Sequence, residues 1–258
     1  MKYICKKTDR EFSYLDLLNS IDAERITLSQ QALGELGTID KRYVAIRHDV
    51  DHDMLLALQF AEVEQEHGIK ATYFLLHSEG YFQNTKRFPG HVQRMSKMGH
   101  EIALHNNALT PWFLEQQHPL GTLQKALQTL RDNTNRVVGT SSHGDSHCYT
   151  YNPDRVLRFV NYQMWYELPK RFSPRPKDIP VISMTDLGLV YEAYFLNRDA
   201  YITDSGGVWA GGVKDETEPF ESYDKQGDDR LDHIISEFNR LDKGVLQLLV
   251  HPFWWTVT

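Results

Sequence analysis

Short apolar runs alternate with longer amphipathic segments along most of this chain. The strongest apolar runs cover residues 43–48, 70–77, 100–105, 137–142 and 245–250. Runs of this length that are rich in β-branched and aromatic residues predict buried strands. The run at 70–77 has no polar face, which is typical of a parallel strand covered on both sides.

Helical periodicity lies between these runs. Apolar residues repeat at helical spacing over 54–67, a segment that follows a capping aspartate, Asp53, and stops before Gly68. The same reasoning predicts further helices at 89–98, 120–132, 153–160 and 229–242, and shorter strands at 189–195 and 199–203.

This alternation predicts an α/β fold with parallel strands, closed into one barrel-like domain over residues 1–258. Residues 1–40 are polar and mixed, and we expect them to form a helical cover at the bottom of the barrel. Residues 211–228 are acidic and poorly periodic, which predicts a long surface loop. A loop with Pro111 and Trp112 is expected before the helix at 120–132.

The apolar runs end on residues that can bind metals or carry protons. Six of them lead directly to a histidine or an aspartate; these residues are Asp49, His77, His105, His143, Asp204 and His251. Parallel α/β enzymes build their active sites from the carboxyl ends of their strands. The pattern therefore predicts a metal-dependent site at one rim of the barrel.

Composition narrows the class of protein. The formal charge is −7 and no basic block is present, which argues against a nucleic-acid partner. Cys5 and Cys148 match no zinc-finger spacing, and two free thiols in a reducing compartment are expected. No segment has the ~20 apolar residues of a bilayer span, and the first residues lack the apolar core of a secretory signal. A cytoplasmic protein is expected.

Asp49 and Asp51 are two residues apart, so an extended segment places both on one face. Two carboxylates on one face can have separate roles, in which one binds a cation and the other takes a proton from water. The alternative is a pair of capping aspartates before the helix at 54–67. Arg47 either orients a carboxylate or forms a surface ion pair, and His48 is expected to pack on the other face.

The motifs themselves resemble a known family. They are Arg47-His48-Asp49-Val50-Asp51, the segments 69–74 and 99–105, Asp204-Ser205-Gly206-Gly207-Val208-Trp209, and the segment 248–255 that contains His251. Together they resemble polysaccharide deacetylases of the NodB type (carbohydrate esterase family 4), and in particular a branch with an "HDVD" first motif. The resemblance spans roughly residues 43–255. It implies a distorted (β/α)7 barrel and metal-dependent removal of an acetyl group from a carbohydrate.

The resemblance also implies roles for single residues. Asp49 is in the position of the general base, Asp51 (or Asp49 itself) is the metal carboxylate, and His105 is the first metal histidine. The family's second metal histidine, four residues on, is Leu109 in this chain. The best substitute is His143, whose alternative role is hydrogen bonding to substrate. His251 is implied to be the general acid that protonates the leaving amine. Asp204 is a candidate either to orient His251 or to pair with a cation across the site. The alternative role of His251 is packing among the neighbouring aromatic residues.

These roles imply a divalent cation, most simply Zn²⁺, with Ni²⁺, Co²⁺ or Mn²⁺ as alternatives. Trp112, Trp209 and Trp254 are candidates for stacking on sugar rings. The expected substrate is an N-acetylated sugar, as a nucleotide sugar or a lipid-linked intermediate in surface polysaccharide synthesis. Two other functions stay open. One is a related deformylase or amidase, and the other is a catalytically silent carbohydrate-binding protein, which Leu109 favours.

Overall fold

The computed structural model describes residues 3–5, 13–32, 34, 36–83, 86–148, 159–172, 174–214 and 227–257. The chain folds into two compact units. The first contains residues 1–73, 98–100 and 197–258, and the second contains residues 74–97 and 101–196. Each unit combines strands with helices.

The first unit is built on a mostly parallel sheet. Its hydrogen-bonded strands, in order, are β2 (Glu24–Ile26), β3 (Arg42–Val50), β10 (Gly244–Val250), β8 (Ala200–Thr203) and the antiparallel β9 (Ala210–Val213). Every residue of β10 is buried, as expected of a central parallel strand. The register joins Gly244 to Arg42 and Val250 to His48, so β3 and β10 end together.

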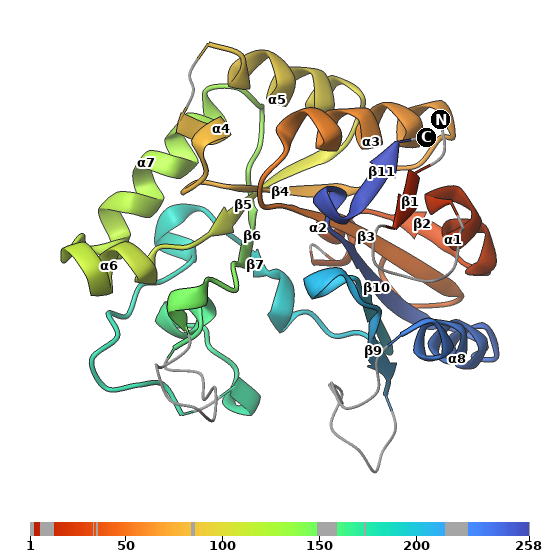
Figure 1. Cartoon of the computed structure of the whole chain (residues 1–258). Helices are drawn as coiled ribbons and strands as arrows, with labels where there is room; N and C mark the ends of the chain where they lie inside the picture. Colours follow the sequence, from red (N-terminus) through yellow and green to blue (C-terminus); the bar gives the residue numbers. More distant parts are fainter. Residues whose placement is uncertain are drawn as a thin grey trace. The chain divides into compact units, whose positions relative to one another are not determined.

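Helices cover this sheet, and a small second sheet joins the ends of the chain. The helices are α1 (Tyr14–Ser20), α2 (Leu28–Ala32), α3 (Met54–Glu66) and α8 (Asp228–Asn239). Asp53 caps α3 by accepting the N–H groups of Leu55 and Leu56, as the sequence predicted. α8 packs against β8 and β9. Figure 1 shows α8 near β9, and β1 (Tyr3–Cys5) beside β11 (Trp255–Val257), its antiparallel partner.

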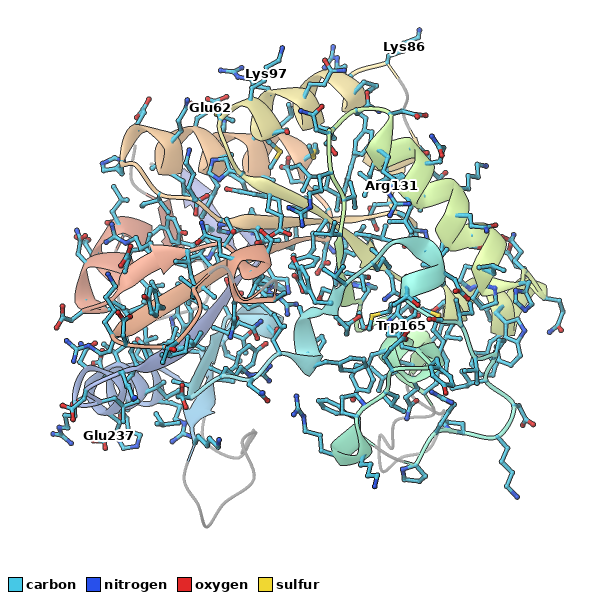
Figure 2. The ribbon with its side chains drawn as sticks, turned by 180° about the vertical axis from the view of Figure 1, so that it is seen from behind. Glu62, Lys86, Lys97, Arg131, Trp165 and Glu237 are labelled. Atoms are coloured by element: carbon cyan, nitrogen blue, oxygen red, sulfur yellow. The ribbon has the colours of Figure 1, made fainter. Side chains whose placement is uncertain are left out.

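The second unit repeats the strand–helix alternation. Its strands, in hydrogen-bonded order, are the end of β4 (Thr72–Leu76), β5 (Glu101–Asn106), β6 (Gly139–Ser142) and β7 (Tyr191–Glu192). Its helices are α4 (Gly80–Gln83), α5 (Phe88–Lys97), α6 (Leu109–Glu115) and α7 (Pro119–Arg131). β5, β6 and β7 are parallel, with His105 opposite Ser141. Lys97, at the exposed end of α5, points away from the strands in Figure 2.

The expected α/β class, with parallel strands separated by helices, is confirmed. The strands predicted at 43–48, 70–77, 100–105, 199–203 and 245–250 are all present within a few residues of their expected bounds. The helices predicted at 54–67, 89–98, 120–132 and 229–242 correspond to α3, α5, α7 and α8. None of the described helices is a candidate membrane span, and the longest, α3 and α7, have 13 residues each.

Several local predictions are wrong. Residues 211–228 are not one loop, because β9 occupies 210–213 and α8 begins at Asp228, while 215–226 lie outside the described residues. Glycines at 211 and 212 hid this strand, since they carry no apolar pattern. The expected loop around Pro111 and Trp112 is the helix α6, in which Pro111 occupies the first turn, where proline is tolerated.

The N-terminal prediction is right in part. Residues 1–40 contain α1 and α2, but also β1 and β2, which are too short to show a period. The strand predicted at 189–195 is reduced to Tyr191–Glu192, followed by a 3₁₀ turn. The strand predicted at 137–142 begins at Gly139, where a Cβ would lie 2.1 Å from the ring of Tyr191. Most of the helix predicted at 153–160 lies outside the described residues.

Candidate active site

β3 ends in an ion pair that is buried in the first unit. The guanidinium of Arg47 donates from Nε to Asp49 Oδ1 (3.2 Å) and from Nη2 to Asp49 Oδ2 (2.6 Å). The two side chains are 0% and 3% exposed. A doubly bonded arginine fixes the plane of a carboxylate and favours its ionised form. Arg47 therefore orients Asp49, and the pair is not a surface ion pair.

Asp51 follows β3 directly and lies close to the end of β10. Because β3 and β10 are parallel and end in register, the segments that follow them lie side by side. Asp51 Oδ2 is 3.9 Å from His251 Nε2. The first unit thus gathers Asp49, Asp51 and His251 at the carboxyl end of its central strands. Asp53 is the residue that caps α3, so Asp49 and Asp51 are not the capping pair that the sequence left open.

His251 is held by a carboxylate that belongs to the neighbouring strand end. Asp204, which follows β8, lies 2.6 Å from His251 Nδ1 through Oδ1, and it also accepts the backbone N–H of His251 (2.9 Å). Asp204 is fully buried. A carboxylate that binds Nδ1–H fixes the ring and leaves Nε2 as the atom available for proton transfer.

Charge sets the protonation state of His251. Burial by itself lowers the pKa of this imidazole, but the carboxylate of Asp204, aided by Asp51 and Asp49, outweighs burial and raises the pKa to about 9. His251 is therefore a cation at neutral pH. A protonated imidazole that presents Nε2–H has the form that a general acid needs.

Trp255 supports this pair, a role that sequence reasoning missed. Its indole Nε1–H donates to Asp204 Oδ2 (2.8 Å), and the ring is fully buried. Trp209 packs against it with ring centroids 6.0 Å apart and is itself 0% exposed. The structure thus gives Trp209 a packing role and no open face for a sugar, which corrects the expectation. Trp255 lies four residues after His251 in the sequence, but nothing in the sequence pointed to Asp204 as the acceptor of its indole N–H.

The second unit holds a pair of histidines at the ends of β5 and β6. His105 Nδ1 lies 2.9 Å from the carbonyl oxygen of Ser141, so it carries the proton and donates. This leaves a lone pair on His105 Nε2, which is 3.2 Å from His143 Nδ1. The register that sets His105 opposite Ser141 explains why the two rings meet. His105 is buried and His143 half-buried.

This donor set suits a divalent cation. Ligating histidines usually donate their other ring N–H to a carbonyl or carboxylate, as His105 does, and two imidazole nitrogens already converge. Leu109, where the resemblance expects a second histidine, is instead fully buried in the first turn of α6. His143 is the imidazole that stands next to His105.

His77 is the third imidazole in this unit. Its Nε2 accepts the backbone N–H of Asn107 (2.9 Å), and its own backbone N–H donates to the carbonyl of His105. Burial, aided by His105 and His143, lowers the pKa of His77 to about 4. His77 is therefore neutral at physiological pH, in contrast to His251.

An asparagine network organises the loop that carries His143. Asn107 donates to Asp145 (2.6 Å) and accepts from Thr110 (2.8 Å) and from Asn161 (3.1 Å). Asn161 also donates to the carbonyl of His143 (2.9 Å). Sequence reasoning missed both asparagines, because Asn161 lies in a segment without regular periodicity. Asp145 and His147 bind each other, with His147 Nδ1 2.7 Å from Asp145 Oδ1.

The remaining histidines near the motifs are structural. His48 is fully buried, 2.8 Å from Glu64, as its position on the opposite face of β3 predicted. Tyr14 and Tyr73 also donate to Glu64. Burial raises the pKa of Glu64, but His48 and its other partners outweigh this and lower it overall. His100 is buried, and its Nε2 lies 2.9 Å from the backbone carbonyl oxygen of Ala61.

Two of the three candidate tryptophans keep an accessible surface. Trp254 is half-buried and packs edge-on against Phe253, which is 39% exposed. Trp112 is half-buried on α6 and packs against Phe113 with ring centroids 4.5 Å apart. Trp165, labelled in Figure 2, is fully buried, and its indole N–H donates to Glu192.

No protein-family profile and no curated protein sequence matches this chain. Among solved structures, it is similar to a CE4 esterase from Streptococcus mutans, with 12% identity, 88% of this chain and 80% of that chain covered, and a TM-score of 0.46. It is also similar to the catalytic domain of a peptidoglycan N-acetylglucosamine deacetylase from Eubacterium rectale, with 15% identity, coverage of 84% and 78%, and a TM-score of 0.41.

A polysaccharide deacetylase from Bacillus cereus matches over a shorter part. The identity is 18%, the TM-score 0.30, and the match covers 40% of this chain and 47% of that chain. These three proteins are of the kind that the sequence motifs resemble. The function proposed below is therefore argued from the chemistry of the site and not from these similarities.

Proposed function

We propose that this chain is a metal-dependent hydrolase that removes an acetyl group from an N-acetylated sugar or sugar intermediate in surface polysaccharide synthesis. The observation that carries the proposal is that the first unit contains both a carboxylate, Asp49, oriented by Arg47, and an imidazolium, His251, held protonated by Asp204. Amide hydrolysis needs both groups, because water must lose a proton and the leaving amine must gain one.

The proposed roles follow from these contacts. Asp49, oriented by Arg47, takes a proton from the attacking water. His251 then gives the proton on Nε2 to the departing nitrogen, while Asp204 and Trp255 hold the ring in place. An amine leaves poorly without a proton, so loss of the acid slows amide cleavage more than ester cleavage.

We propose Asp51, His105 and His143 as the ligands of a divalent cation, most simply Zn²⁺. Each residue lies at the carboxyl end of a parallel strand: His105 is within the last two residues of β5, while Asp51 and His143 directly follow β3 and β6. One carboxylate and two imidazoles match the donor set of catalytic zinc sites that keep an open position for water. A bound cation supplies Lewis-acid polarisation of the acetyl carbonyl and lowers the pKa of water.

Release of acetate tests the proposal. The protein, loaded with Zn²⁺ or Co²⁺, is incubated with N-acetylated oligosaccharides, O-acetylated xylan and an N-formylated amino sugar, and the acid released is identified. We expect acetate from the N-acetylated sugars, its loss after treatment with a chelator, and its recovery when metal is returned. Formate as the only product would favour the deformylase alternative. Tight metal binding with no acid released from any sugar would contradict the proposal and favour a silent binding protein.

A further inference from the structure

Asn161 is a buried asparagine that joins two segments of the second unit. It begins a short 3₁₀ turn, Asn161–Met164, and it is 0% exposed. Its Oδ1 accepts the backbone N–H of Leu109 (3.0 Å), and its Nδ2 donates to the backbone carbonyl of His143 (2.9 Å). A single amide group therefore connects the first residue of α6 to the loop that follows β6 and carries His143.

Asn107 continues this bracing toward His105. Its Oδ1 accepts from Asn161 Nδ2 (3.1 Å), and its backbone N–H donates to His77 Nε2 (2.9 Å). The backbone N–H of His77 in turn donates to the carbonyl of His105 (3.4 Å). An unbroken series of hydrogen bonds thus runs from the backbone of His143 to the backbone of His105, the two members of the histidine pair.

The backbone of His143 matters because His143 faces His105 through Nδ1. The distance from His143 Nδ1 to His105 Nε2 is 3.2 Å, so Nδ1 is the atom of His143 that is placed to bind a cation together with His105. Nδ1 lies closer to Cα along the side chain than Nε2 does, so a shift of the backbone moves it almost directly. A ligand has to be held to within about 0.5 Å by its surroundings, and His143 is only half-buried.

An amide is the group that makes both contacts of Asn161. The N–H of Leu109 needs an acceptor and the carbonyl of His143 needs a donor, and asparagine offers one of each at the end of one side chain. An aspartate of the same shape would set a carboxylate oxygen against the carbonyl oxygen of His143 and Oδ1 of Asn107. An alanine would make neither contact.

We propose that Asn161 is a positioning residue of the cation site, which holds the backbone of His143 so that its Nδ1 stays beside His105 Nε2. Asn161 is not itself a ligand, because its oxygen is bonded to the N–H of Leu109 and its nitrogen to two oxygen acceptors. The inference rests on the proposed function and deepens it, since the affinity for the cation then depends on a residue outside the ligand set. Such supporting partners typically contribute about 10–100-fold to metal affinity.

The Kd for Zn²⁺, measured on metal-free protein by competition with a chromogenic chelator, tests this role without catalysis. Asn161→Ala removes both contacts, and Asn161→Asp keeps the acceptor but loses the donor. Each variant is expected to raise the Kd about 10–100-fold. Gln163→Ala is the matched control, because it removes a side-chain hydrogen bond to the N–H of Val160 from the same 3₁₀ turn, and its Kd should be unchanged.

Two further readouts separate positioning from a general loss of stability. In a double-mutant cycle, Asn161→Ala should weaken zinc binding no further once His143→Ala is present, because Asn161 acts through His143. Water that replaces an imidazole raises the coordination number of Co²⁺ and weakens its visible absorption, so Co²⁺ bound to Asn161→Ala should absorb less than Co²⁺ bound to the natural protein. Circular dichroism confirms that the variants are folded, and the second substitution at Asn161 guards against the loss of one.

The outcomes distinguish this role from the proposed function. A raised Kd in the Asn161 variants, absent in the His143→Ala background, supports the role even if the natural protein releases no acetate, in which case only the deacetylase proposal fails. An unchanged Kd in folded Asn161 variants, or an equal loss in the His143→Ala background, overturns the role, while acetate release by the natural protein leaves the deacetylase proposal standing. A natural protein that binds no Zn²⁺ overturns both the cation site and the role of Asn161.

Discussion

The two units use the same side chain in opposite protonation states. In the first unit, His251 lies against Asp204 and within 3.9 Å of Asp51, and carboxylates raise its pKa to about 9. In the second unit, His77 accepts a backbone N–H and lies near two other imidazoles, and burial lowers its pKa to about 4. Both rings are deeply buried, so burial alone does not decide the outcome.

The partner of a buried histidine therefore determines the chemical role of its ring. A carboxylate partner makes the ring a proton donor, whereas a backbone partner fixes one tautomer and leaves a neutral ring with a lone pair or a single N–H. His105 also has a backbone partner, since its Nδ1 lies 2.9 Å from the carbonyl oxygen of Ser141. Changing the partners should therefore convert one kind of site toward the other.

The largest effect is expected when the carboxylate of Asp49 is removed. Asp49→Asn keeps the shape but cannot accept a proton, so kcat for acetate release should fall by about 10²–10⁴-fold. The readout is steady-state kinetics on an N-acetylated oligosaccharide. Asp53→Asn is the matched control, since asparagine caps a helix as well as aspartate does, and its activity should be unchanged. An active Asp49→Asn enzyme would contradict the role of general base.

The next effect concerns the pH profile. Asp204→Asn removes the main charge that raises the pKa of His251, so the pKa should drop toward or below its ordinary value of about 6.5. The alkaline limb of kcat/KM should move from about pH 9 toward pH 6.5, and activity at pH 8 should fall roughly 30-fold, the change in protonated fraction. Superimposable pH profiles of the variant and the natural protein would show that His251 is not the acid.

The free energy of unfolding should also depend on the protonation of His251, and it should decrease as the pH rises. The pKa of His251 is higher in the folded state, so its contribution to the free energy of unfolding is full below about pH 6.5 and is lost as the pH rises through about 9. Urea unfolding at pH 6 and pH 10 measures this. The natural protein should lose more stability between these values than Asp204→Asn does, and an equal loss would argue against the charged pair.

A smaller effect is expected from Trp255→Phe. This change removes one donor to Asp204, and a hydrogen bond to a charged group contributes about 1.5–3 kcal/mol. We expect a loss of that size in the free energy of unfolding, a modest drop in kcat and no change in metal content. Trp254→Phe, next in sequence but half-buried, is the control and should leave stability within about 0.5 kcal/mol. Equal effects of the two changes would contradict the role of Trp255 in holding Asp204 and His251 in place.

The sequence predicted those elements that have a regular hydrophobic period, and those site residues that lie at the end of a strand. The long strands β3 and β10 and the capped helix α3 were predicted, and so were the residues at strand ends that form the Arg47–Asp49 and Asp204–His251 pairs. Side-chain contacts across distant segments were not predictable, because no local pattern encodes them. Trp255 on Asp204 and Asn161 on the carbonyl of His143 are of this type.

Other errors have local causes. β9 contains two adjacent glycines and was taken for a loop, and α6 was hidden by Pro111, which is compatible with a first helical turn. Trp209 was expected to contact sugar because it follows a strand on a loop, yet its ring fills the space beside Trp255. Burial of an aromatic residue on a loop depends on its tertiary neighbours, which the sequence does not state.

The central claim is that Asp51, His105 and His143 bind one divalent cation, and metal content measures it directly. Purified protein is dialysed against Zn²⁺, freed of excess metal and analysed by mass spectrometry, alongside Asp51→Ala, His105→Ala and His143→Ala. His147→Ala, whose side chain is 44% exposed and paired with Asp145, is the matched control. The account predicts one Zn²⁺ per chain in the natural protein and in the control, and at least a tenfold lower content in each of the three variants. Full metal content in the His105 or Asp51 variant, or none in the natural protein, would contradict it.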